Sequence, residues 1–208
     1  MSQVDPFTPT SLFAFPLFSF ALGESEKHRE PLVRDILALR SKHAGARRSN
    51  RNSWHSGEEF RAADSEHVTW VLASAMTFAK RALARYYNDW ATTELRLGSY
   101  WANVSGPGGW NAPHHHFPTH WSGVYYVSVG NTVAGTGPAG REDLSGMIEF
   151  LNPTPWQATW NRSGNFTVGP KDGTGLLFPA SLMHFVHPHQ VEEDRISIAY
   201  NFSVFPKS

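Results

Sequence analysis

The sequence predicts an α+β fold in which two helices precede a barrel or sandwich of short strands. Two segments before residue 90 carry a helical pattern of apolar residues, and many short β-type runs separated by Gly, Pro, Asn and Asp follow them. The chain has 208 residues, of which 40% are hydrophobic, and no break in composition divides it. This is enough material for one sizeable core, so we expect a single domain over residues 1–208.

The expected helices span residues 30–44 and 66–87. In the first, Pro31 suits the opening turn and Gly45 follows the last residue. In the second, apolar residues recur at the helical period from Val68 to Tyr86. We expect both helices to form a layer that supports the strands. The polar segment 47–57 between them is predicted to be a loop, and the apolar stretch 12–22 a buried strand.

The expected strands begin after Trp90 and are short. They span residues 93–104, 122–129, 147–151, 157–160, 166–168, 175–178, 184–187 and 195–204. The Gly-rich segment 130–145 shows no periodicity and is long enough to form a lid or a binding loop.

Charge and residue usage narrow the classes of function. Lys plus Arg and Asp plus Glu number 18 each, so the formal net charge is zero and we expect no nucleic-acid partner. The absence of Cys excludes disulfides and thiolate metal ligands. No segment reaches the roughly 18 consecutive apolar residues of a membrane span. We expect a cytoplasmic protein without a membrane partner, and leave open whether it forms a homodimer.

Seven of the 11 histidines lie in two short stretches, residues 114–120 and 184–189, expected on the first and last strands of one β-rich unit. Positions i and i+2 of a strand face the same side, so His114 and His116 can bind one metal ion together. A third ligand from a distant strand would leave open positions for water or substrate, as a catalytic metal needs. A chance polar loop explains the first stretch equally well, and a lone histidine such as His184 is more often structural. His115 should face away from its neighbours.

The strand predicted at 195–204 separates polar from apolar side chains. Arg195, Ser197, Ala199 and Asn201 share one face. A buried arginine is costly to desolvate unless an anion meets it, and its planar guanidinium suits a carboxylate. Its partner could be an acidic residue of the preceding turn, 192–194, or an anionic cosubstrate that lies between Arg195 and the metal.

Four motifs together resemble a bacterial and phage family of 2-oxoglutarate/Fe(II) oxygenases. They are residues 111–116, residues 122–127, Phe178-Pro179 with His184, and residues 195–202, and the polar block 49–56 extends the resemblance over most of the chain. The resemblance implies a double-stranded β-helix, a jelly-roll or cupin-like barrel supported by the N-terminal helices, that holds Fe(II) and 2-oxoglutarate.

The resemblance also implies a role for individual residues. By position, His114, His116 and His184 are the iron ligands and form the catalytic centre. Arg195 is similar to the residue that binds the C5 carboxylate of 2-oxoglutarate, with Ser197 beside it. In the matching register Tyr126 faces inward and its hydroxyl helps Arg195, while Asn103 faces the metal-binding end of the cosubstrate. His116 departs from the wider superfamily, which usually has a carboxylate at this position.

These features predict an enzyme, an Fe(II)/2-oxoglutarate-dependent dioxygenase. It would couple O2 and the decarboxylation of 2-oxoglutarate to succinate with the oxidation of a small-molecule or peptide substrate. The alternative is a three-histidine cupin-like dioxygenase or isomerase that binds its substrate directly on the metal without 2-oxoglutarate. A third reading is a binding module with a structural zinc, which would need four protein ligands. We expect substrate contacts from the segment 130–145 with Trp110, His120 and Trp121.

Overall fold

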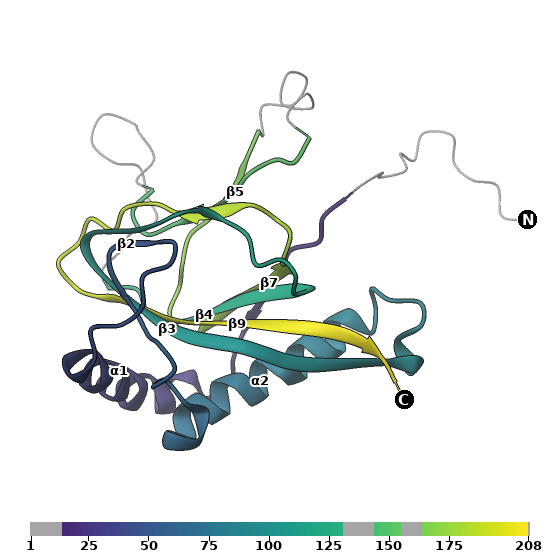
Figure 1. Cartoon of the computed structure of the whole chain (residues 1–208), viewed down its shortest axis with the longest axis horizontal. Helices are drawn as coiled ribbons and strands as arrows, with labels where there is room; N and C mark the ends of the chain where they lie inside the picture. The colour runs from purple at the N-terminus through teal and green to yellow at the C-terminus, as the bar shows by residue number, and fades with distance from the viewer. Residues whose placement is uncertain (1–13, 131–143, 155–163, 208) are drawn as a thin grey trace, which may run out of the picture.

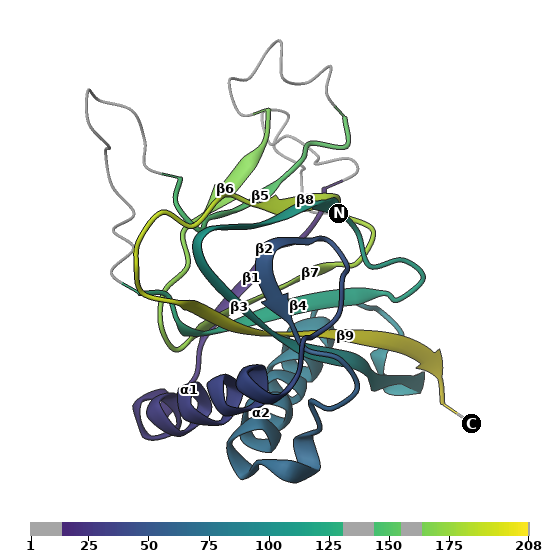
Figure 2. The ribbon, with the colours of Figure 1, turned by 60° about the vertical axis from the view of Figure 1, so that its left-hand side comes forward.

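The computed structural model describes residues 14–130, 144–154 and 164–207, and these form one curled antiparallel sheet backed by two helices (Figure 1). In chain order the elements are β1 (Phe18–Ala21), α1 (Ser25–Lys42), β2 (Asn50–His55), η1 (Ala62–Asp64), α2 (Glu66–Leu83), η2 (Trp90–Thr92), β3 (Thr93–His114), β4 (Trp121–Ser128), β5 (Ile148–Phe150), β6 (Phe166–Val168), β7 (Thr174–Pro179), β8 (His184–Val186) and β9 (Arg195–Pro206). The strand order is β1-β7-β4-β9-β3-β8-β5-β6, with β2 paired to β3. The sheet bends into a half-barrel, with β5, β6 and β8 opposite β4 and β7 (Figure 2).

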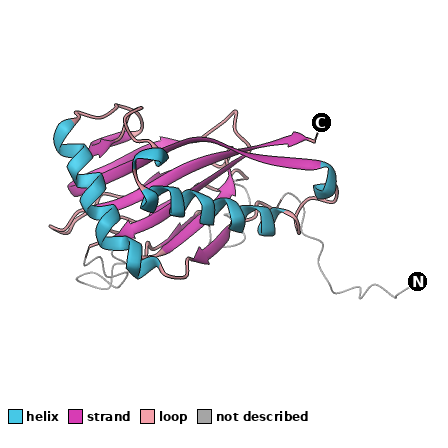
Figure 3. Cartoon of the chain, turned by 90° about the horizontal axis from the view of Figure 1, so that it is seen from below, coloured by secondary structure: helices cyan, strands magenta, loops and turns pink. Residues whose placement is uncertain are grey.

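The helices cover the convex face of the sheet, as the sequence predicts (Figure 3). α2 begins where the Ser65 hydroxyl accepts a hydrogen bond from the Val68 backbone N–H, which satisfies one of the free donors at a helix start. Its apolar stripe and the buried Leu32 and Ile36 of α1 pack against the outward side chains of the long strands in one core. No helix among the described residues has the length and apolar character needed to cross a membrane.

β9 lies between β3 and β4 and divides its side chains between the two faces of the sheet. Ile196, Ile198, Tyr200 and Phe202 belong to the core under the helices, whereas the alternate residues line a cavity on the concave face. The register pairs Ser197 with Asn103 of β3 on one side and with Tyr126 of β4 on the other. Residues directly opposite each other point to the same face, so these three polar side chains form one row inside the half-barrel.

Several element boundaries differ from the sequence-based expectations. α1 begins at Ser25, so Pro31 lies inside the helix, and α2 ends at Leu83. The segment 47–57 is not only a loop: it contains β2, whose polar residues pair with β3. β3 runs on to His114 because its second half pairs with β2 and β8. The expected strand at 157–160 and most of the expected lid at 130–145 lie outside the described residues.

Gly123 offers a test of this packing. A methyl group there would collide with the ring of Tyr200 and would approach the Leu176 carbonyl oxygen to 2.6 Å. Overpacking of this kind costs about 1–3 kcal/mol, so Gly123→Ala should lower the free energy of urea unfolding by that amount. The matched control is Gly98→Ala, whose new methyl meets nothing closer than the Asn201 carbonyl oxygen at 3.5 Å. Equal stability of the two variants would contradict the proposed close contact between β4 and Tyr200.

Candidate metal centre

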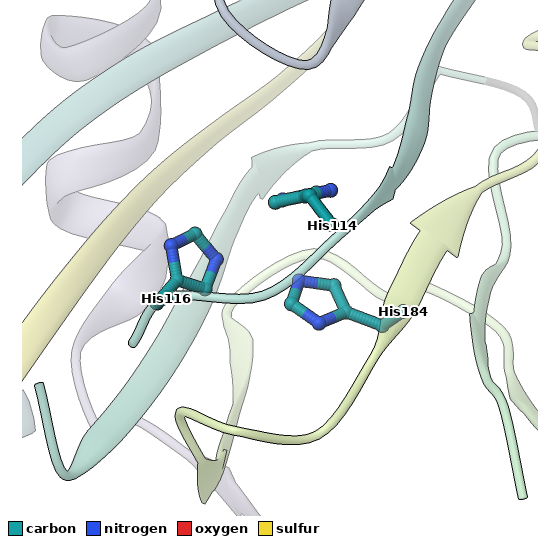
Figure 4. Close-up of side chains that lie close together, drawn as sticks. All are labelled: His114, His116 and His184. Carbon is teal, nitrogen blue, oxygen red and sulfur yellow. The ribbon is translucent and has the colours of Figure 1, made fainter. Parts of the chain in front are cut away.

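Three histidines from two strand ends come together on the concave face. His114 is the last residue of β3 and pairs directly with His184, the first residue of β8, while His116 lies two residues beyond the end of β3. The nearest ring nitrogens of the three all lie within 4.8 Å of one another. The rings turn toward a common point (Figure 4). The two histidine stretches are therefore adjacent in the sheet, although β8 is not the last strand of the unit.

Hydrogen bonds to the backbone fix two of the three rings. Nδ1 of His114 donates to the Ala112 carbonyl oxygen at 2.7 Å, and Nδ1 of His184 donates to the Leu182 carbonyl oxygen at 2.9 Å. Because a carbonyl only accepts, each Nδ1 carries the proton and each Nε2 keeps its lone pair. Metal-binding histidines are held in this way by partners on the ring nitrogen that does not bind the metal.

Burial keeps these imidazoles neutral. Burial, with a smaller contribution from the neighbouring histidines, lowers the pKa of His184 to about 3 and that of His116 to about 4. The pKa of His114 is also lowered, mainly by burial. Neutral rings with free lone pairs are the form that binds a metal ion. Among the described residues the group has three side chains, one fewer than a closed structural zinc site requires.

A cavity of about 790 Å³ extends from the three histidines to Arg195. Arg195 is only 3% exposed, and its guanidinium carbon lies 5.1 Å from the centre of the Tyr126 ring. Burial lowers the pKa of Arg195, which Tyr126 partly offsets. The acidic turn before β9 does not neutralise it: Asp194 pairs with Arg40 of α1 at 2.9 Å, and in the described part of the chain no carboxylate forms an ion pair with Arg195.

The other sequence-predicted polar residues line the same cavity. Asn103, Tyr126 and Ser197 face it from the shared row of β3, β4 and β9. The Tyr126 hydroxyl and the Asn103 carbonyl oxygen Oδ1 are both buried, and neither has a hydrogen-bond partner among the described residues. Buried polar atoms are normally paired, so two unpaired ones that face one cavity indicate a polar ligand.

Other candidate residues lie elsewhere. His115 is exposed at the edge of the cavity, as expected for a residue that faces away from its neighbours. His120 accepts a hydrogen bond from the Val204 backbone N–H, and Trp121 is buried against the helices, where it donates to the Tyr87 hydroxyl. Neither lines the cavity, and Trp110 does not either, so the cavity gives no support to the substrate contacts expected from these three residues.

Sequence reasoning missed an aromatic wall beside the histidines. His55 of β2 stacks on Trp101 with ring centres 5.5 Å apart, and the Trp101 ring lies 5.4 Å from that of His116. All three line the cavity. The alternation of β3 places Trp101 and Asn103 on one face and so indicates Trp101, whereas the polar composition of residues 47–57 predicts a loop and gives no sign of His55 in β2.

Comparisons with known proteins bear on the family and on the fold. Residues 99–201 match the family described as "Putative 2OG-Fe(II) oxygenase". A prolyl-4-hydroxylase from Pseudomonas putida is 16% identical over 92% of each chain, with a TM-score of 0.60. A prolyl hydroxylase from Trichoplax adhaerens, in complex with a peptide fragment of the hypoxia inducible factor oxygen degradation domain, is 12% identical over 91% of this chain and 83% of that one, with a TM-score of 0.62.

HygX from Streptomyces hygroscopicus, with nickel and 2-oxoglutarate bound, is 13% identical over 90% of this chain and 82% of that one, with a TM-score of 0.55. At these identities the likeness concerns the fold, and it confirms the expected double-stranded β-helix. None of the curated proteins compared with the chain matches it.

The depressed histidine pKa values predict a loss of stability in acid when no metal is present. An unfolded histidine titrates near pH 6.5, while buried His184 stays neutral to about pH 3, so the unfolded chain binds more protons below pH 6.5. In the presence of EDTA, His184 should therefore contribute a loss of roughly 1 kcal/mol in unfolding free energy between pH 7 and pH 5.5. Urea unfolding of wild type and His184→Phe at both pH values checks this. The same loss in both proteins would contradict it.

Proposed function

Because residues 99–201 belong to the 2OG-Fe(II) oxygenase family, we propose that the three histidines hold Fe(II) and that Arg195 anchors 2-oxoglutarate in the same cavity. The observation that carries this proposal is the joint position of a neutral three-histidine group and a buried arginine without an ion pair among the described residues. When bound, iron and 2-oxoglutarate supply the oxidising chemistry, in which O2 and 2-oxoglutarate give succinate and CO2 while a C–H bond of a second substrate is oxidised.

The donor set fits both groups. Imidazole nitrogens suit Fe(II), and the lone pairs of His114 and His184 are held toward the centre by their backbone hydrogen bonds. Three neutral ligands leave the ferrous site at +2, so the dianionic cosubstrate would neutralise it without a protein carboxylate. The histidine at position 116 is therefore compatible with 2-oxoglutarate, although it departs from the usual carboxylate.

The polar residues on the concave face would each contact a different part of 2-oxoglutarate. The guanidinium of Arg195 would bind the C5 carboxylate, and the Tyr126 hydroxyl beside it would donate a further hydrogen bond. Ser197 lies between Tyr126 and Asn103 in the register, so it would bind the same anion from the centre of the row. Asn103 would face the end of the cosubstrate nearer the metal. Burial of the row excludes water from these contacts.

The primary substrate would lie against Trp101 and His55. This wall is next to His116, and exposed Arg48 and Glu58 stand on the rim of the cavity. A small molecule or a peptide would fit this open side. The peptide complex of the Trichoplax adhaerens prolyl hydroxylase supports the peptide as one class of substrate. A cytoplasmic location stays a prediction from the sequence, and the formation of a homodimer stays open.

The cupin-like alternative uses the same residues differently. In that reaction Arg195 would bind a carboxylate of the primary substrate, and 2-oxoglutarate would be neither bound nor consumed. The two functions are distinguished by succinate, which only the oxygenase releases.

The proposed metal site predicts which histidine substitutions weaken Fe(II) binding and which do not. His114→Ala, His116→Ala and His184→Ala should each weaken Fe(II) binding by at least about 100-fold, since removing even an outer partner of a ligand costs 10–100-fold. His115→Ala is the matched control and should keep one Fe(II) per chain. Anaerobic equilibrium dialysis measures both. Loss of iron in His115→Ala with retention in His116→Ala would contradict the assignment.

Turnover tests the function itself. Wild type supplied with Fe(II), ascorbate, O2 and 2-oxoglutarate should release succinate above a metal-free blank even without its primary substrate, and His114→Ala should not. Succinate is quantified by chromatography of the quenched mixture. An iron-loaded wild type that releases none would leave the cupin-like function as the better account.

A further inference from the structure

The turn before β9 contains a buried histidine that the proposed function does not use. His189 is 0% exposed, and its ring nitrogen Nδ1 has no hydrogen-bond partner among the described residues. We propose that His189 is a positioning residue for Arg195: its Nδ1 accepts a hydrogen bond from a water molecule that Nε–H of Arg195 donates to, and this bridge holds the guanidinium toward 2-oxoglutarate. The inference rests on the proposed function.

The backbone around His189 is fixed on several sides. Its N–H donates to the Gly109 carbonyl oxygen at 2.9 Å, and its carbonyl oxygen accepts from the Gly108 N–H at 2.7 Å. The next residue, Gln190, donates its backbone N–H to the Ser145 hydroxyl at 2.9 Å. The ring is therefore carried by a turn that is hydrogen-bonded to β3 and to the segment before β5. It cannot swing freely.

One hydrogen bond decides which nitrogen of the ring is an acceptor. Nε2 lies 2.6 Å from the Glu193 backbone carbonyl oxygen. A carbonyl oxygen only accepts, so Nε2 carries the proton and, in the neutral ring, Nδ1 has a free lone pair. A buried lone pair without a partner is unfavourable, and it is expected to meet a donor.

The matching donor also lies next to Gly146. A methyl group built on this glycine would be 3.3 Å from Nδ1 of His189, 3.1 Å from Cδ of Arg195 and 3.5 Å from its Nε. Nε of Arg195 is itself buried without a partner among the described residues. An unpaired acceptor and an unpaired donor thus border the same small space, which a larger residue at 146 would occupy. Gly146 also has a φ of 65°, a conformation that favours glycine.

The consequence concerns how the anion is bound. The terminal nitrogens of a guanidinium bind a carboxylate best when its plane is fixed. The Tyr126 ring restrains Arg195 from one side, and a hydrogen bond at Nε would restrain rotation of the plane from the opposite end of the group. His189 would therefore act on 2-oxoglutarate affinity through Arg195, without touching the cosubstrate or the metal.

Two substitutions distinguish the contribution of Nδ1 of His189 from that of Nε2. An Asn side chain places its amide atoms two bonds from Cβ, as Nδ1 is, so His189→Asn keeps an acceptor toward Arg195 and loses the Glu193 contact. A Gln side chain places them three bonds from Cβ, as Nε2 is, so His189→Gln keeps the Glu193 contact and loses the acceptor. Anaerobic calorimetry of the Ni(II)-loaded proteins measures the Kd for 2-oxoglutarate, and thermal unfolding checks that each variant is folded.

We expect His189→Gln to weaken 2-oxoglutarate binding by roughly 5- to 30-fold, while His189→Asn stays within about 3-fold of wild type. The KM for 2-oxoglutarate should rise in the Gln variant with little change in kcat. Equal affinities in all three proteins, or a loss confined to His189→Asn, would overturn the proposal. Arg195→Lys separates the positioning role of His189 from the proposed anion site at Arg195. Unchanged 2-oxoglutarate affinity in this variant would reject the anion site itself.

A measurement on the metal-free wild type tests the contact even if the His189 variants fail to fold. The Nε–H resonance of Arg195, identified by its loss in Arg195→Lys, should exchange slowly with solvent. A rapidly exchanging Nε–H in the wild-type protein would overturn the contact between Arg195 and His189.

Discussion

The register of β9 between β3 and β4 is the constraint on which the site depends. It pairs Ser197 with Asn103 and Tyr126 and turns Arg195 toward the same cavity. A shift of one residue would move every polar side chain of β9 into the core beneath the helices and bring Ile196 to the anion pocket. Burial of the apolar face against α1 and α2 therefore secures the register, and the register in turn sets the chemistry of the concave face.

The site is polar, and several of its buried polar atoms have no partner among the described residues. A guanidinium that is only 3% exposed has no carboxylate partner in the described ranges, while Asp194 next to it is bound to Arg40. Desolvating an unpaired charge costs several kcal/mol, so an anionic ligand gains the whole of the compensating interaction. The neutral histidines at the other end of the cavity are suited to bind a metal cation. A dianion that joins the two satisfies both ends at once.

Alternation and local spacing predict the α+β class and part of the candidate site, while the resemblance to the oxygenase family implies the double-stranded β-helix and the roles of the individual residues. Residues 195–202 alternate strictly, and His114 and His116 lie close in the chain, so neither needs long-range information. Alternation and local spacing do not predict β2, because its polar residues form a strand only by pairing with β3. For the same reason they do not predict the position of His55. No pattern in the sequence links His189 to Arg195. Their proximity depends on the turn before β9 and on Gly146, which is more than 40 residues away in the chain.

The central claim is that one cavity holds Fe(II) and 2-oxoglutarate together. Anaerobic titration of the Fe(II)-loaded chain with 2-oxoglutarate tests it most directly, because the cosubstrate bound on the metal gives a weak visible charge-transfer band. The account predicts that this band appears, saturates at one 2-oxoglutarate per chain and is lost in His184→Ala. An iron-loaded wild type whose spectrum does not change as 2-oxoglutarate is added would contradict it.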